Sequence, residues 1–305
     1  MIASPGALYL RFRLWSQHGL VAAYYRDVVR PRILKLPPLK TTGQQCEIHA
    51  LTSAQDWLNL VWGLRSFYYF SGADYRLCIH DDGTVPEAAF EHLRRQFPQA
   101  RVIPRRQADA IVEPILSRYP RSLAFRNNNR LALKLFDTLA CAEADRLLIF
   151  DSDLLFFAKP LALLERIDDS DYRKNLFNAD FESAYTVDPE AVRGLLGFPL
   201  AERVNSGLGL VHRDSLRLDW IEQFLELPGI LAGHFWRIEQ TLFALCSSRW
   251  GVELLPEPHY TLSLQPGIDG RPFRHYVGVV RHLFYREGIR HLVRNGFLDA
   301  LRDRN

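Results

Sequence analysis

Apolar runs alternate with amphipathic segments along most of the chain after residue 43. Runs rich in Val, Ile, Leu and Cys predict strands at 46–53, 75–83, 100–104, 146–153, 205–216 (with a turn at its end) and 251–256. Apolar positions at helical spacing predict helices at 54–72, 85–97, 130–142, 216–227 and 237–250. Strands that alternate with helices, and near-continuous apolar runs such as "LLIF", predict an α/β fold with a mostly parallel sheet covered by helices on both faces.

The same pattern divides the chain into three parts. Residues 1–43 mix aromatic residues with arginines and close with Pro37 and Pro38, so we expect a separate segment before a main domain at 44–285. Residues 286–305 are expected to form a C-terminal amphipathic helix. The N-terminal segment either packs on the main domain as a helix or lies on an anionic membrane surface, with arginines among the headgroups.

Composition narrows the class of protein. A chain of 305 residues with 48% hydrophobic residues can bury a large core, and a formal charge of +3 argues against a nucleic-acid-binding protein. Four cysteines without a CxxC pair are typical of reduced thiols in the cytosol. No apolar run approaches the roughly 20 residues that cross a bilayer. We therefore expect a cytoplasmic protein, soluble or at the membrane periphery.

Two carboxylates interrupt the most hydrophobic stretch, "RLLIFDSDLLFFAKP". Asp151 and Asp153 follow directly after a predicted strand, where open α/β sheets bind their ligands. Like charges this close repel unless a cation lies beside them, and Mg²⁺ and Mn²⁺ take carboxylates together with substrate phosphates. The pair therefore predicts a site for a metal-bound diphosphate. The alternative is an ordinary turn at the end of a strand, in which the Asp-x-Asp pattern also occurs.

"LLIFDSDLLFFAKPLALL" resembles the Asp-x-Asp segment of nucleotide-sugar glycosyltransferases with the GT-A fold, a Rossmann-like α/β architecture. Three further segments follow in the family's order: "VNSGLGLVHRDSL", "IEQTLFALC" and "HYVGVVR", the last similar to a segment of the glycogenin-like family eight. The resemblance covers about residues 46 to 285. It implies transfer of a sugar from a nucleotide diphosphate, with Mn²⁺ or Mg²⁺ as cofactor.

The resemblance also implies roles around the diphosphate. His275 would be the third protein ligand of the metal, beside Asp151 and Asp153. Gly278 would let the backbone approach a phosphate. Arg281 stands where the family usually has Lys, and it would neutralise the leaving diphosphate as a planar, bidentate donor instead of a point charge.

Further donor contacts follow from the same comparison. The first strand would place Leu51 and Thr52 near the base and ribose, and "IHDDG" would bring Asp81 or Asp82 there, with Asp82 taken as the candidate. The remaining expected donor contacts, to the diphosphate or sugar, are Arg130, Lys134, Ser152, Asn205, Ser206 and Gly207.

Glu239 and Gln240 are the remaining catalytic candidates, together with Asp153. Glu239 could act as the general base for the acceptor hydroxyl or hold the donor sugar, and Gln240 could lie near the anomeric carbon. A base at the acceptor would mean inversion, and its absence would favour retention; the sequence leaves both open. Acids at a helix start are also favourable simply through the helix dipole.

We expect a UDP-sugar as the first donor to test, and a glycan, a lipid-linked sugar or a protein as acceptor. A haloacid-dehalogenase-like phosphatase also begins with a strand and Asp-x-Asp, but that motif usually opens its chain and continues with Thr or Val. A sugar nucleotidyltransferase would need a Gly-rich, Lys-bearing loop, which "HALTSAQDW" lacks. The remaining alternative is a GT-A-like nucleotide-sugar-binding protein without activity.

Overall fold

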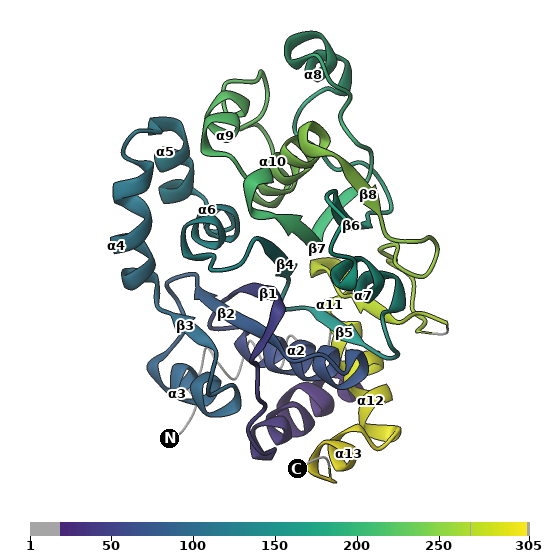
Figure 1. Ribbon diagram of the computed structural model, residues 1–305. Helices are drawn as coiled ribbons and strands as arrows, with labels where there is room; N and C mark the ends of the chain where they lie inside the picture. Colours follow the sequence, from purple (N-terminus) through teal and green to yellow (C-terminus); the bar gives the residue numbers. More distant parts are fainter. Residues whose placement is uncertain (1–18, 269, 304–305) are drawn as a thin grey trace.

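A seven-stranded sheet runs through the centre of the protein (Figure 1). The computed structural model describes residues 19–268 and 270–303. The strand order is β3–β2–β1–β4–β7–β6–β8. The strands are β1 (Gly43–Thr52), β2 (Tyr75–Asp81), β3 (Arg101–Ile103), β4 (Arg146–Phe150), β6 (Asn175–Ala179), β7 (Val204–His212) and β8 (Val252–Leu254).

Most neighbouring strands are parallel, as predicted. β1 is parallel to β2 and β4, β2 to β3, and β6 to β8, whereas β7 is antiparallel to both β4 and β6. Parallel neighbours need crossover segments, and helices occupy these crossovers. The strand order reverses at β1 and β4, so their carboxyl ends border a crevice in which α/β proteins bind ligands.

Helices cover both faces of the sheet (Figure 1). They are α2 (Trp57–Ser71), α3 (Glu87–Gln96), α4 (Arg105–Leu116), α5 (Pro120–Asn128), α6 (Ala132–Cys141), α7 (Leu161–Asp168), α8 (Pro189–Leu196), α9 (Leu218–Phe224), α10 (Phe235–Trp250), α11 (Arg281–Leu283), α12 (Arg290–Arg294) and α13 (Phe297–Asp303). Short 3-10 or π-helical turns are η1 (Tyr25–Val29), η2 (Arg30–Lys35), η3 (Arg213–Ser215), η4 (Gly278–Val280) and η5 (Phe284–Ile289).

The apolar run of β4 faces two different cores. Leu148 and Phe150 belong to the core that α2 closes, and Leu147 and Ile149 belong to the core that α6 and α10 close. A strand that is buried on both faces has no polar side to show, which explains the continuous run "LLIF".

A second, two-stranded sheet lies beside the end of β4. β5 (Leu154–Phe156) pairs antiparallel with β9 (Phe273–His275). Its residues Leu154, Leu155 and Phe156 are fully buried. The Phe156 amide donates to the Ser66 hydroxyl of α2 at 3.0 Å. The apolar letters after the Asp pair are therefore a short strand that packs under α2.

The two ends of the chain are described to different extents. Of the predicted N-terminal segment, residues 1–18 lie outside the described residues, residues 19–24 are helical, and η1 and η2 follow. The C-terminal region consists of η5, α12 and α13, with Gly296 between the last two at φ +75°. The three-part division of the chain stays a prediction.

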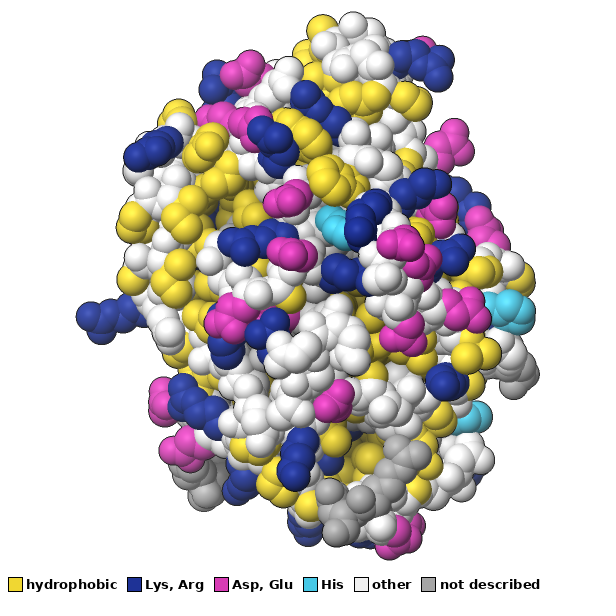
Figure 2. Space-filling model, in the orientation of Figure 1, with side chains coloured by type: hydrophobic (Ala, Val, Ile, Leu, Met, Phe, Trp, Pro, Cys, Tyr) yellow, Lys and Arg dark blue, Asp and Glu magenta, His cyan; other side chains and the backbone are white. Residues whose placement is uncertain are grey.

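Charges on the face shown in Figure 2 are interspersed, with Lys and Arg beside Asp and Glu, in keeping with the small formal charge of +3. Among the described residues, no helix has the length and apolar character to cross a bilayer.

Candidate active site at the carboxyl end of β4

The turn Asp151–Ser152–Asp153 is tied to both neighbouring strands of β4. The Asp151 amide donates to the Gly207 carbonyl of β7 at 2.8 Å. The Ser152 hydroxyl donates to the Leu51 carbonyl at the end of β1 at 3.0 Å. These bonds fix the backbone, so both acidic side chains leave the turn in defined directions.

The pairing of β5 with β9 brings His275 to this turn. Leu154 is opposite His275 in the register, and the Tyr276 amide donates to the Asp153 carbonyl at 2.9 Å. His275 Nε2 lies 3.0 Å from Asp153 Oδ1 and 3.6 Å from Asp151 Oδ2. Each of Asp151, Asp153 and His275 has one potential metal-ligating atom, and these three atoms lie within 4.8 Å of one another. Two carboxylates and an imidazole suit Mn²⁺ or Mg²⁺.

Asn205 determines which nitrogen of His275 faces the carboxylates. Its amide nitrogen donates to Asp180 at 3.0 Å, and its Oδ1 accepts from the Gly207 amide at 3.0 Å, which fixes the orientation of the amide. Asn205 Oδ1 lies 3.1 Å from His275 Nδ1, so Nδ1 must carry the proton that it donates. In the neutral ring, the Nε2 lone pair then faces Asp151 and Asp153, which is the tautomer that a metal ligand needs.

The carboxylates favour the charged ring when no other cation is bound. Burial lowers the pKa of His275, but Asp153 and Asp151 raise it by more, so the net shift is upward. A divalent cation at this site would replace that proton, because metal ligation requires the neutral imidazole.

Arg281 completes the surroundings of Asp153. Its guanidinium donates to Asp153 Oδ2 at 2.6 Å and to Asp56 Oδ1, at the start of α2, at 2.8 Å. Burial would raise the pKa of Asp153, but the charges of His275 and Arg281 lower it below its ordinary value. Asp153 is therefore ionised although it is buried.

Lys134 bridges the Asp151 carboxylate and Glu239 of α10. Lys134 Nζ lies 2.8 Å from Asp151 Oδ1 and 3.2 Å from Glu239 Oε1, and the Ser206 hydroxyl donates to Glu239 Oε2 at 3.1 Å. Burial lowers the pKa of Lys134, but the two carboxylates raise it above its usual value. Burial raises the pKa of Glu239 to about 7 against the opposing effect of Lys134. This network has a permanent cation and one carboxyl group that titrates near neutrality.

These groups line one cavity of about 690 Å³. The cavity lining includes most of the predicted site residues: Leu51, Lys134, Asp151, Ser152, Asp153, Asn205, Ser206, Gly207, Glu239, Gln240, His275, Gly278 and Arg281. Three predicted residues, Thr52, Asp82 and Arg130, are not in the lining. The volume falls in the range of pockets that hold small molecules.

The three outlying residues have other contacts. Thr52 lies behind the turn, where its hydroxyl accepts from Ser152 at 3.3 Å. Arg130 is 3.9 Å from Asp82 at the surface, with a side chain that is 69% exposed. Asp82 accepts from the Thr84 amide at 2.9 Å, and Asp81 accepts from Gly83 and Val85, so both aspartates stabilise the loop after β2.

Asp180 is a residue of this site that the sequence analysis missed. It follows β6 and accepts from Asn205 at 3.0 Å and from Gln240 at 3.3 Å. "LFNAD" has the same form as "LLIFD", an apolar strand that ends in an acid, and this signal could have found it. The cavity continues past Asp180 to a second wall formed by Phe181, Glu182 and residues 234–237.

A second group of buried potential ligands, His49, Cys78 and His80, lies between β1 and β2. The rings of the two histidines are inclined by only 19°, with centroids 5.2 Å apart and Nδ1 of His49 2.9 Å from Nε2 of His80. His49 Nε2 lies 3.2 Å from Glu47. An N–H···N hydrogen bond accounts for this arrangement, and no metal site is needed to explain it.

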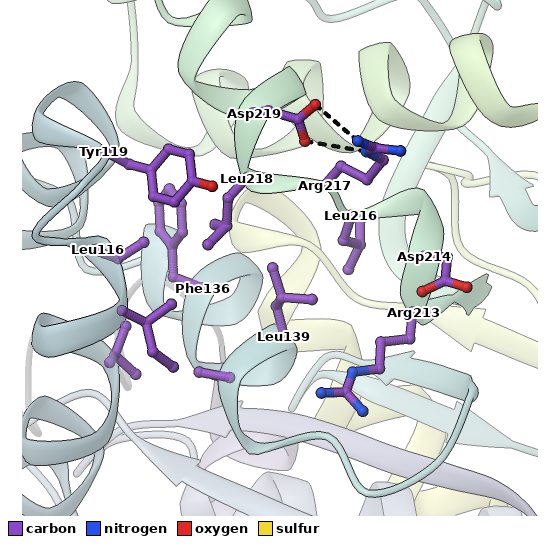
Figure 3. A pocket seen from close by; sticks show the side chains of 13 residues that line it. Leu116, Tyr119, Phe136, Leu139, Arg213, Asp214, Leu216, Arg217, Leu218 and Asp219 are labelled. Atoms are coloured by element: carbon purple, nitrogen blue, oxygen red, sulfur yellow. Dashed lines mark hydrogen bonds and ion pairs between the residues drawn. The ribbon is translucent and has the colours of Figure 1, made fainter.

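A smaller hollow of about 350 Å³ lies between α4, α6 and α9 (Figure 3). Leu116, Phe136, Leu139 and Leu218 point into it, while Arg217 and Asp219 pair with each other at its rim. Apolar side chains gather over α4 and α6 on the left of Figure 2. No predicted site residue lines this hollow.

No protein-family model and no curated protein matches this sequence. Solved glycosyltransferase structures do match in three dimensions. WbbM, a bifunctional glycosyltransferase, has a TM-score of 0.50 and 11% identity, covering 87% of this chain and 53% of WbbM. An active-site mutant of LgtC has a TM-score of 0.46 and 15% identity, covering 76% of this chain and 87% of LgtC. The mannosyltransferase Ktr4p from S. cerevisiae has a TM-score of 0.45 and 12% identity, covering 90% of each chain.

At such identities the likeness concerns the fold. The predicted α/β architecture of GT-A type is confirmed by the sheet and by the match to WbbM. Membership of the glycogenin-like family eight stays a prediction.

Proposed function

We propose that this protein is a metal-dependent glycosyltransferase that moves a sugar from a nucleotide diphosphate to a hydroxyl group of an acceptor. The observation that carries the proposal is the convergence of Asp151, Asp153 and His275 Nε2 within 4.8 Å in the wall of a cavity of small-molecule size. Carboxylate oxygens are the ligands that Mn²⁺ and Mg²⁺ prefer, and the adjoining cavity is large enough for a diphosphate that would bind the same metal ion.

Asp151, Asp153 and His275 would hold Mn²⁺ or Mg²⁺, which, when bound, supplies positive charge to the diphosphate oxygens as the glycosidic bond breaks. Arg281 has a second role on the same leaving group. It is held by Asp153 and Asp56 at the cavity wall, where its guanidinium can donate to diphosphate oxygens. Gly278 lies beside open space, so its backbone can approach a phosphate closely.

The sugar would lie on the opposite side of the Asp pair, against Lys134, Asn205, Ser206, Gly207 and Gln240. Leu51 and Ser152 would contact the nucleoside, with Thr52 behind them. Glu239, whose pKa is raised to about 7, is suited to accept the proton of the acceptor hydroxyl. The donor to test first is a UDP-sugar, and glycans, lipid-linked sugars and proteins are the acceptor classes.

The test measures release of nucleoside diphosphate and free or transferred sugar from a panel of nucleotide sugars, with Mn²⁺, with Mg²⁺ and with a chelator. We expect one donor to be turned over only with a divalent metal. Asp153→Asn, which keeps the shape but not the charge, should lower kcat/KM by about 100-fold or more, since several kcal/mol of charge stabilisation are lost.

Two results would contradict the proposal. Pyrophosphate in place of nucleoside diphosphate would indicate a nucleotidyltransferase. Donor binding in a thermal-shift assay without turnover of any donor would indicate a binding protein. Asp171→Asn, an exposed acid on a loop, is the matched control and should keep wild-type activity.

A further inference from the structure

The first described helical segment has an apolar face that is largely exposed, and its Tyr24 packs edge-to-face on Tyr25 of the same segment. Leu20, Tyr24 and Val28 recur at a spacing of four and are 71%, 48% and 49% exposed. Val21 beside them is 43% exposed. The opposite face is buried through Ala22, Ala23, Val29 and Ile33. The segment is thus apolar on both sides, and only one side serves the core.

The exposure is a fixed feature of the fold. The Trp62 indole of α2 donates to the Arg30 carbonyl at 2.9 Å, and Arg30 donates to Asn59 of α2 at 2.8 Å. The Arg30 guanidinium also lies 5.3 Å from the centre of the Tyr285 ring. The segment contacts α2 and η5, at one end of the molecule (Figure 1). The apolar face is therefore presented by a helix that is anchored on its other side.

Exposed cations follow this face along the chain. Arg32, Lys35 and Lys40 are exposed and form no ion pair within the described part of the chain, whereas the acid of the segment, Asp27, pairs with Arg26 at 2.9 Å. The preceding residues 1–18 contain no Asp or Glu, and "LYLRFRLW" alternates apolar residues with Arg11 and Arg13. A segment that combines exposed apolar side chains with unpaired cations is complementary to anionic headgroups over an acyl layer.

We infer that residues 19–35 dock on an anionic membrane surface, with Leu20, Tyr24 and Val28 at the boundary of the acyl region and Arg32 and Lys35 among the headgroups. A second copy of this chain is a less favourable partner for this apolar face than a membrane. A stable protein interface uses about 20 to 30 residues a side, and the unpaired cations of two copies would repel each other. This inference does not depend on the proposed function.

Docking there would also bring the cavity close to the bilayer. Arg30 is bonded to Asn59, Asn59 lies 3.5 Å from Asp56, and Asp56 lines the cavity with Arg281. One turn of α2 therefore separates the docked segment from the cavity wall.

The test is co-flotation of the full chain with vesicles of phosphatidylcholine alone and with vesicles of phosphatidylcholine and phosphatidylglycerol in equal parts. We expect binding to the anionic vesicles only, and weaker binding when salt rises from about 0.1 M to about 0.5 M. The variant Leu20→Ser, Tyr24→Ser, Val28→Ser should bind the anionic vesicles at least about tenfold more weakly. Ile111→Ser, Ile115→Ser, Leu195→Ser removes the same number of exposed apolar groups elsewhere and should bind as the wild type does.

A second variant, Arg32→Glu, Lys35→Glu, leaves the apolar face intact. It tests membrane binding independently if the triple variant does not fold. It should lose binding to anionic vesicles at unchanged Tm. The inference is overturned if the wild type floats with neither vesicle, or if both variants bind as the wild type does. It is also overturned if sedimentation shows a dimer that the triple variant abolishes while no vesicle is bound. None of these readouts involves sugar transfer, so a failure of the proposed function would not be confused with a failure here.

Discussion

The His275 ring lies directly against the backbone of Gly207. A Cβ atom placed on Gly207 would be 2.3 Å from His275 Cε1 and 2.5 Å from Nδ1. Gly207 has no unusual φ angle, so the glycine of the "NSG" segment is required by space and not by backbone conformation. Its missing side chain is what allows His275 to reach the two aspartates.

Gly207→Ala is expected to weaken Mn²⁺ binding by about tenfold or more, because the ring must turn away from Asp151 and Asp153 or strain its bond to Asn205. Overpacking should also cost about 1 to 3 kcal/mol of unfolding free energy. Titration calorimetry with Mn²⁺ and urea unfolding measure the two effects. Gly194→Ala, where a Cβ meets open space, is the control, and equal metal affinities in the two variants would contradict this account.

Lys134 compensates the buried Glu239 and the partly buried Asp151 at once, so its loss should lower the stability of the fold. Lys134→Met leaves Asp151 and Glu239 without their cation, and we expect a loss of about 3 to 5 kcal/mol in unfolding free energy. Adding Glu239→Gln should restore part of that loss, because a buried Glu239 without Lys134 must take up a proton at neutral pH on folding, and the amide does not. Urea unfolding of the single and double variants checks this; a double variant that is no more stable than Lys134→Met would refute the pairing. Lys174→Met removes an exposed ion pair to Glu253 and should change stability little.

Local pattern was sufficient for most of the sheet and for the position of the acidic pair. β1, β2 and β7 contain enough apolar residues to be predicted as strands, and β4 is a continuous apolar run after Arg146. Asp151 and Asp153 follow β4, so their place at the sheet edge follows from strand geometry. His275 could be assigned only by family resemblance. Its approach depends on pairing β9 with β5, a long-range contact that no periodicity encodes.

The roles of Arg130 and Lys134 also depend on long-range packing, which local sequence patterns do not encode. Arg130 and Lys134 are four residues apart around the start of α6, yet one is exposed and the other is buried between two carboxylates. Which of them faces the cavity is decided by the packing of α6 on β1, β2 and α10. Asp180, in contrast, carried a local signal, since it ends a strand as Asp151 does.

Asp180 is expected to tune the site without touching the metal. It holds the Asn205 amide, whose oxygen accepts from His275 Nδ1, so Asp180→Ala frees the amide to turn and lets the ring lose its tautomer. We expect Mn²⁺ affinity to fall by about tenfold, with a parallel loss in kcat/KM. Asp188→Ala, which removes an exposed helix cap, should lower stability without changing metal affinity. Unchanged metal binding in Asp180→Ala would show that Asn205 is oriented by other groups.

The hydrogen-bonded pair of His49 and His80 should make the protein sensitive to mild acid. Burial lowers the pKa of both rings below the ordinary value of about 6.5, so below that pH the unfolded chain binds protons that the folded chain does not. Stability contributed by these neutral rings is therefore present above about pH 6.5 and is lost as the pH falls, by about 1.4 kcal/mol for each pH unit in the case of His80, whose pKa is lowered furthest. His80→Gln removes one of these groups. The change in unfolding free energy between about pH 7.5 and about pH 5.5 should be smaller in this variant by about 1.4 kcal/mol, since other titrating groups contribute equally to both proteins.

Surface His259→Gln is the matched control and should follow the wild type. If the stability of His80→Gln changes with pH as that of the wild type does, His80 takes up its proton in the folded protein.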